Sequence, residues 1–314
     1  MTQTGWIFPG QGAQSARMAA KFIGRGTFET VLDTIEDISG KPVRDFTTKM
    51  ADPDLKRTDR AQLAIFAMSS AIAACLREEG LSPAFVAGHS LGHFSALAAS
   101  GALSLEDATQ LVVERGQLML FSGERVAGGM GVVQGLSADA VSETLKEAKL
   151  KIWPANLNLP EQIVVSGAVE DLDPARAVLT AKGGKWVPLN VSGAFHSPLL
   201  ANEARAFADR IKETAFSTPI CPVLSNKDGS PMRSGRDIQD DLLTHMTGQV
   251  NWTAVMSRIA DQAPDSLIEV GPGKVLTGLM LRFNPALKPA STGVPALMDR
   301  AITAHTPQMQ EVAA

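Results

Sequence analysis

The sequence predicts an α/β fold with a mainly parallel sheet and a smaller α+β subdomain inserted into it. Strand-like apolar runs alternate with helix-length segments over the first 125 residues, and this alternation returns after about residue 193. Between these parts the chain carries short β-branched runs. We therefore expect one large domain, formed by residues 1–125 and 193–314, and an inserted subdomain at residues 126–192.

The first part of the chain supplies two predicted strands and three predicted helices. The strands are GWIFPGQG at 5–12 and AFVAGHS at 84–90. The helices are DRAQLAIFAMSSAIAACLREEG at 59–80, LGHFSALAASGAL at 91–103 and LEDATQLVVERGQLMLFSG at 105–123. Helices between successive strands imply crossover connections and parallel pairing.

The middle and last parts differ in pattern. Strand-like GGMGVVQGL (128–136), NLPEQIVVSG (158–167) and KWVPLNVSG (185–193) are separated by helix-like segments at 137–149 and 170–184. Afterwards ANEARAFADRIKET (201–214) predicts a helix, PICPVLSN (219–226) a strand, and 265–282 a strand, a glycine turn and a helix. From about Pro285, several prolines without periodicity predict a loosely packed tail.

Composition excludes several classes of function. A net charge of −4 provides no basic field for nucleic acid, and no apolar run approaches the ~20 residues that span a bilayer. The two cysteines and five histidines show no zinc-type spacing, so we expect no metal site. The N-terminus lacks a basic segment followed by a long apolar one. We expect a cytoplasmic, reduced, soluble monomer.

The segment GHSLG at residues 88–92 matches the GxSxG pattern of a nucleophile elbow. The motif alone is weak, but a strand-like segment precedes Ser90 and a small-residue helix follows it, as an elbow requires. The N–H of Leu91, at the start of that helix, is placed to bind an oxyanion. A serine in a tight structural turn is the alternative interpretation.

An activated serine needs a base, and the sequence offers five histidines. His89 should point away from Ser90, and His93, one helical turn on, is better suited to helix–sheet packing. His245 and His305 have no chemical signal around them. His196 lies where a strand-like run gives way to a turn, so it is the preferred base, with an ordinary loop histidine as the alternative.

Seven motifs together resemble the malonyl-CoA:acyl carrier protein transacylase family, including the stand-alone acyltransferases that load polyketide synthases. They occur in the family's order over about residues 5–283: FPGQGAQ (8–14), AGHSLG (87–92), ERGQLM (114–119), NLNLPEQIVVSG (156–167), GAFHSPLL (193–200), VNW (250–252) and EVGPGKVLTGL (269–279). The resemblance implies a hydrolase-like α/β core with an inserted ferredoxin-like subdomain.

The resemblance also implies catalytic roles. Ser90 would be the nucleophile and His196 the general acid–base. A carbonyl near the position matching Asn251 would orient the imidazole in place of a triad carboxylate, which avoids a second negative charge beside a malonyl group. The backbone N–H groups of Gln11 and Leu91 would form the oxyanion hole.

Substrate-binding residues follow in the same way. Arg115 would bind the malonyl carboxylate, although its helix alone indicates a solvated helix-end arginine. The ring of Phe195 would exclude an α-methyl group, and Gln62 and Gln162 match glutamines near the family's active site. His93 stands where the family usually has an acid in GHSxGE, which bears on acyl preference.

The implied activity is transfer of malonyl from malonyl-CoA to the phosphopantetheine thiol of an acyl carrier protein through a Ser90 ester, with no bound cofactor. The alternatives are an acyl carrier protein hydrolase with the same serine and histidine, a transferase for another acyl group, and a non-catalytic docking module. Arg115 and Phe195 favour the malonyl activity, because a hydrolase that clears stalled chains has no need to hold a free carboxylate.

Overall fold

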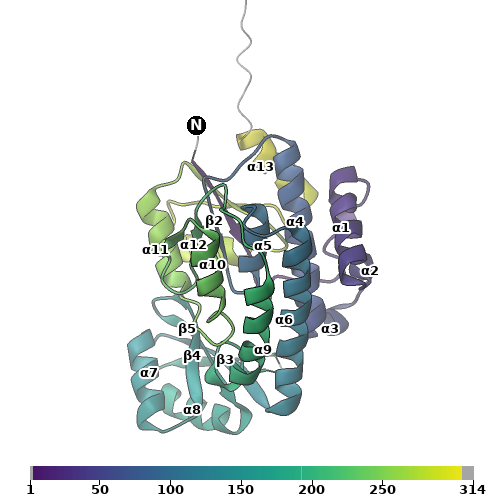
Figure 1. Cartoon of the computed structure of the whole chain (residues 1–314). Coiled ribbons are helices and arrows are strands. Elements are labelled where there is room, and N and C mark those ends of the chain that lie inside the picture. Colours follow the sequence, from purple (N-terminus) through teal and green to yellow (C-terminus); the bar gives the residue numbers. More distant parts are fainter. Residues whose placement is uncertain (1–2, 192, 306–314) are drawn as a thin grey trace, which may run out of the picture.

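The computed structural model describes residues 3–191 and 193–305, which form two sheets covered by helices (Figure 1). The larger sheet has the order β10-β9-β1-β2-β7-β8 and is parallel except for β8, which runs antiparallel to β7. Its strands are β1 (Thr4–Phe8), β2 (Phe85–Gly88), β7 (Val223–Leu224), β8 (Pro231–Met232), β9 (Ser266–Glu269) and β10 (Ala290–Ser291). The predicted mainly parallel α/β core is confirmed.

Both faces of the larger sheet are buried, and β1 shows how. Trp6 and Phe8 lie in the core cluster that holds the apolar side chains of α1, α4 and α6. Ile7, which points to the opposite face, packs in a second cluster with Trp252 of α11 and Met280 of α12. A strand covered on both sides is apolar throughout, which explains why β1 and β2 appear as continuous apolar runs.

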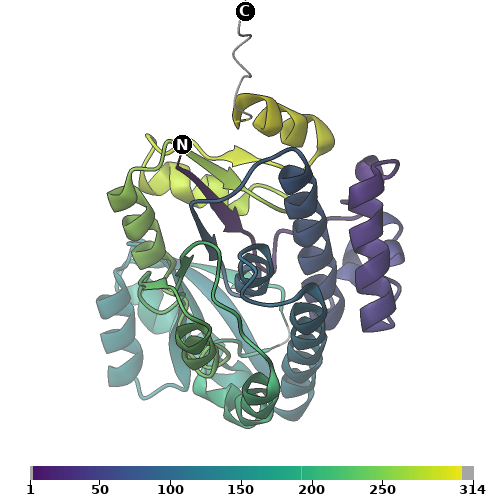
Figure 2. The ribbon, with the colours of Figure 1, turned by 45° about the horizontal axis from the view of Figure 1, so that its top comes forward.

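Eleven described helices surround the larger sheet. They are α1 (Gly26–Ser39), α2 (Val43–Thr48), α3 (Asp52–Leu55), α4 (Thr58–Glu78), α5 (Gly92–Ala99), α6 (Leu105–Arg125), α9 (Ala201–Glu213), α10 (Gly235–Leu242), α11 (Trp252–Gln262), α12 (Val275–Phe283) and α13 (Pro295–His305). Short 3-10 turns occur at Ala20–Phe22 and Pro198–Leu200. Helix α4 is buried on almost every side because α1 packs outside it (Figure 2).

The smaller sheet is antiparallel, with the order β4-β5-β3-β6. Its elements follow one another as β3 (Gly128–Gln134), α7 (Ala138–Glu147), β4 (Ile152–Leu159), β5 (Gln162–Ala168), α8 (Val169–Ala181) and β6 (Lys185–Leu189). This βαββαβ order is ferredoxin-like, as expected. These elements fall inside residues 126–192, and the division of the chain into two domains there stays a prediction. Sequence patterns missed most of β4, whose half-buried residues lack clear alternation.

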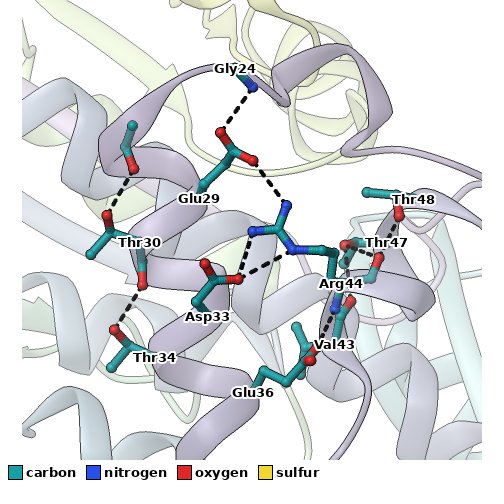
Figure 3. A network of polar contacts seen from close by, with 11 residues as sticks. Gly24, Glu29, Thr30, Asp33, Thr34, Glu36, Val43, Arg44, Thr47 and Thr48 are labelled. Atoms are coloured by element: carbon teal, nitrogen blue, oxygen red, sulfur yellow. Dashed lines mark hydrogen bonds and ion pairs between the residues drawn. The ribbon is translucent and has the colours of Figure 1, made fainter.

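Two other segments differ from expectation. The tail after Pro285 is not loosely packed up to residue 305, because β10 pairs with β9 and α13 buries Met298 and Ala301. Helices α1 to α3 fill a stretch for which the sequence indicated no elements. The side chain of Arg44 fixes α2 against α1 by pairing with Glu29 at 2.9 Å and Asp33 at 2.6 Å (Figure 3).

Candidate active site

Ser90 lies at the sharp turn between β2 and α5, with a left-handed φ of 50°. A side chain on Gly88 would place its Cβ 2.0 Å from the carbonyl oxygen of Gly92, and one on Gly92 would lie 2.1 Å from that of Phe8. The two glycines are therefore required by close backbone approach. A non-glycine residue in this conformation costs on the order of 1–3 kcal/mol, and such strain is typical of functional turns.

His196 reaches Ser90 from the loop after β6, across 106 residues of chain, with a distance of 2.7 Å between Ser90 Oγ and His196 Nε2. Its Nδ1–H donates to the carbonyl oxygen of Gly248 at 2.9 Å. Because that hydrogen bond fixes the proton on Nδ1, Nε2 carries the lone pair that accepts from the serine hydroxyl. Burial, and secondarily the charge of Arg115, lower the pKa of His196 to about 3, so the ring is a neutral base at neutral pH.

The sequence predicted that a carbonyl near the position of Asn251 orients His196, and the structure corrects this prediction. The orienting carbonyl belongs to Gly248, three residues earlier, in the turn before α11. The side chain of Asn251 instead accepts a hydrogen bond from Ala254 N–H at 3.0 Å and caps α11. An asparagine before a helix is well suited to capping, which accounts for its side chain.

Arg115 is 1% exposed, so the prediction of a solvated helix-end arginine is wrong. Its guanidinium donates to Ser90 Oγ at 3.0 Å and to Gln62 Oε1 at 2.6 Å, and lies 5.6 Å from the ring centre of Phe94. Among the described residues it forms no ion pair, and burial lowers its pKa to about 9. A buried cation without a carboxylate partner is costly, and an anion bound beside Arg115 would offset that cost.

The structure places two other predicted substrate residues around this group. Gln62 is fully buried on α4; its oxygen accepts from Arg115 and its nitrogen lies 3.2 Å from Met119 Sδ. Phe195 is 5% exposed and directly precedes His196. Its ring folds over Gly193, so a Cβ added at that glycine would lie 2.3 Å from the ring. Gln62 therefore adjoins the reacting groups through Arg115, whereas Phe195 is a neighbour of the base along the chain.

Two predicted substrate residues lie elsewhere. Gln162 accepts a hydrogen bond from Arg282 of α12 at 2.7 Å, in a surface hollow of about 410 Å³, and no contact joins it to Ser90 or His196 within the described chain. The side chain of His93 is 0% exposed and, within the described residues, makes no hydrogen bond to Ser90 or His196. At the second residue of α5, its ring packs behind the elbow against Asn226 and His245.

The remaining histidines do not serve Ser90 directly. His89 points away, as expected, and donates from Nε2 to Asn158 at 2.9 Å. His245 stacks on His93 with 5.4 Å between ring centres and meets His196 edge-on at 5.8 Å. His305 contacts the carbonyl of Ala301 in α13.

Two backbone donors beside the serine have no acceptor in the described chain. These are the N–H groups of Leu91, at the start of α5, and of Gln11. The loop of Gln11 packs onto the elbow, since a Cβ on Gly10 would lie 2.4 Å from the carbonyl oxygen of His89. Both donors are therefore free to meet a developing negative charge.

Sequence patterns missed Asn226, Gly248 and His245, which contact Ser90 or His196, and Asn158, which accepts from His89. Asn226 had a usable signal, because it ends the predicted strand PICPVLSN, and the carboxyl ends of parallel strands share one edge of the sheet. For Gly248 there was none, since any residue supplies a carbonyl.

The described residues bring together no group of three histidine, cysteine or acidic side chains able to bind a metal. Over the same residues, no helix has the length and apolar character to cross a membrane.

Comparison with known proteins shows the family of this chain. Residues 5–286 match the family model described as an acyl transferase domain. A malonyl CoA-acyl carrier protein transacylase from Synechocystis is 34% identical over 93% of this chain and 97% of its own length. The polyketide biosynthesis protein PksE of Bacillus subtilis is 35% identical over 98% of this chain and 40% of its own.

Solved structures agree. A malonyl-transacylase in complex with a type II PKS acyl-carrier protein aligns with a TM-score of 0.91 at 31% identity, covering 96% of this chain and 100% of that one. The transacylase of Xanthomonas oryzae aligns with a TM-score of 0.92 at 31% identity, covering 97% and 98%. With the family model extending over most of its length, this protein belongs to the acyl transferase family that includes the malonyl CoA-acyl carrier protein transacylases.

Proposed function

We propose that this protein transfers a malonyl group from malonyl-CoA to the phosphopantetheine thiol of an acyl carrier protein, through a malonyl ester on Ser90. One observation carries the choice of acyl group. The buried guanidinium of Arg115 lies 3.0 Å from Ser90 Oγ and has no carboxylate partner in the described chain. A malonyl thioester supplies a free carboxylate two carbons from the carbonyl under attack.

In the first half-reaction Ser90 Oγ attacks the thioester carbonyl while its proton passes to His196 Nε2. The proton on Nδ1 stays hydrogen-bonded to Gly248, so the imidazolium that forms is held in place. When the tetrahedral intermediate collapses, the carbon–sulfur bond breaks and His196 returns the proton to the sulfur of coenzyme A. The malonyl group is then an ester of Ser90.

In the second half-reaction the carrier protein's thiol gives its proton to His196 and attacks the ester carbonyl. Collapse breaks the ester bond and returns the proton to Ser90 Oγ. In both intermediates the negative oxygen would accept from the N–H groups of Leu91 and Gln11. Loss of one such donor costs about 3 kcal/mol in measured systems.

Phe195 is proposed to limit the space beside the malonyl α-carbon. Its ring is fixed over Gly193 and precedes the base directly, so an α-methyl group would meet it. Discrimination of this kind is modest, about 1–3 kcal/mol per methyl-sized group.

Intact-mass analysis after mixing with malonyl-CoA tests the proposal. The protein should gain one malonyl group that is absent from Ser90→Ala, and adding a phosphopantetheinylated carrier protein should move that group to the carrier. Absence of the adduct from the unmodified protein would refute the mechanism. Formation of the adduct followed by release as free malonate in the presence of the carrier would instead identify a hydrolase.

A further inference from the structure

The strained elbow of Ser90 is held by a side chain from another strand. Asn226 follows β7, which pairs in parallel with β2, and its amide therefore lies beside the turn that ends β2. Its Oδ1 accepts from Ser90 N–H at 2.9 Å, and its Nδ2 donates to the carbonyl oxygen of Gly88 at 2.7 Å. One amide thus joins the two backbone groups on either side of His89.

The amide orientation is itself fixed. Ser90 N–H can only donate and the Gly88 carbonyl can only accept, so oxygen and nitrogen of Asn226 cannot be exchanged. The second hydrogen on Nδ2 points to His93 Nδ1 at 3.2 Å, which must then carry a lone pair. His93 is completely buried, and its Nε2 lies 3.6 Å from Asp241 Oδ2, which favours the proton on that nitrogen.

Asn226 also contacts the segment that holds the base. Its backbone carbonyl accepts from Asn251 N–H at 2.7 Å, three residues after the Gly248 carbonyl that binds His196 Nδ1. Asn226 is 3% exposed and is therefore shielded from water. Its side chain bonds to the backbone of the elbow and to His93, and not to Ser90 Oγ or His196.

We propose that Asn226 is a positioning residue for the transfer reaction: its amide, aligned by His93, keeps the nucleophile elbow in the conformation that presents Ser90 Oγ to His196 and leaves Leu91 N–H free for the oxyanion. This inference rests on the proposed function of Ser90. It also gives His93 a role, since an acceptor at this position completes the hydrogen bonds of the amide.

The test is the single-turnover rate at which the protein takes up malonyl from malonyl-CoA, followed by intact mass. Asn226→Ala should slow this step about 10- to 100-fold, the size expected for misplacement of reacting groups, while the final adduct still approaches one per chain. A merely structural role would lower the amplitude of the adduct and leave the rate of the remaining active molecules unchanged. Asn226→Asp keeps the size of the side chain but places a second acceptor against the Gly88 carbonyl, so it should also slow acylation. This variant provides the test if Asn226→Ala does not fold.

Ser234→Ala is the matched control. Ser234 caps α10 through Asp237 N–H at 3.1 Å and contacts neither the elbow nor His93, so its loss should lower the melting temperature without slowing acylation. A wild-type rate in both Asn226 variants would overturn the inference. No adduct in the unmodified protein would overturn the proposed function instead.

A double-mutant cycle tests whether His93 acts through Asn226. His93→Phe keeps the ring and removes the acceptor, and should slow acylation less than Asn226→Ala does. Added to Asn226→Ala, it should have no further effect. An equal slowing by His93→Phe in both backgrounds would show that His93 acts independently of the amide, contrary to the proposal.

Discussion

At the scale of single residues, Arg115 is expected to favour substrate binding and to lower the stability of the folded protein. Its guanidinium is buried among Ser90, Gln62 and Phe94 and lacks an anion in the described chain. A buried charge without a partner destabilises the folded protein, yet under the proposed function the same charge would supply binding energy for a substrate carboxylate. The proposed ligand, rather than the fold, would then account for the residue.

Arg115→Met should separate these two contributions. We expect kcat/KM for malonyl-CoA to fall by about 10²-fold or more, because the proposed charge-assisted hydrogen bonds to the malonyl carboxylate would be lost. The melting temperature should rise, because an apolar side chain of similar length replaces an unpaired charge. Thioester kinetics and thermal unfolding measure the two effects.

Arg125→Met is the control from the same helix, since Arg125 is partly exposed and pairs with Glu203 at 2.9 Å. It should leave malonyl loading unchanged and lower the melting temperature, because the buried carboxylate of Glu203 loses its partner. A less stable Arg115→Met that still loads malonyl normally would contradict this account.

At the scale of elements, the site depends on how closely β1, β2 and α5 approach one another. Helix α5 begins at Gly92, whose missing side chain lets it contact the end of β1. The loop after β1 carries Gln11 to the same place. The catalytic turn and a proposed oxyanion donor are thus positioned by the packing of one helix against two strands.

Gly92→Ala should destabilise the protein strongly, by about 3 kcal/mol or more, because the new Cβ would lie 2.1 Å from the backbone oxygen of Phe8. Urea unfolding and soluble yield measure the effect. Gly278→Ala, inside α12 with no atom within 4 Å of the added Cβ, is the matched control and should be neutral or stabilising by about 0.5–1 kcal/mol. Equal stability of the two variants would refute the close-packing argument.

At the scale of the whole molecule, four of the five histidines are gathered around one end of β2, and each has a lowered pKa. Burial is the largest cause of the lowered pKa in each of the four, which are His89, His93, His196 and His245. The folded state therefore keeps these imidazoles neutral, whereas in the unfolded chain they bind protons once the pH falls below the ordinary histidine pKa of about 6.5. Their full contribution to the free energy of unfolding should be present above pH 6.5 and should be lost as the pH falls toward 3.

For His196 alone, with a pKa of about 3, the expected loss at pH 5.0 is about 2 kcal/mol. Urea unfolding at pH 7.5 and 5.0 measures it. Glu269 acts in the opposite direction because burial raises its pKa, so a comparison is needed to isolate the imidazoles. His245→Phe keeps an aromatic ring in place and should make the dependence on pH shallower; an unchanged slope would contradict the assignment to the buried rings.

Much of the architecture was predictable because it depends on local patterns. Alternating apolar strands and helices indicated the parallel core, and short β-branched runs indicated three of the four strands of the smaller sheet, whose ferredoxin-like order was implied only by the family resemblance. Helices α1 to α3 and the packed helix α13 were missed, because their burial depends on contacts with α4 and with the edge of the larger sheet rather than on their own periodicity.

The sequence by itself determined the fold class, the glycine-flanked Ser90 and, through separated motifs, the candidates His196 and Arg115. Only the tertiary structure decided that the Gly248 carbonyl binds His196, that Arg115 is buried without an anion in the described chain, and that Gln162 pairs with Arg282. It also decided that the amide of Asn226 bridges Gly88 and Ser90. The physical reason is the separation along the chain over which each interaction acts. Turn geometry and periodicity act between neighbours along the chain, whereas a carbonyl acceptor, a desolvated charge or an amide bridge depends on which distant backbone the fold brings within 3 Å.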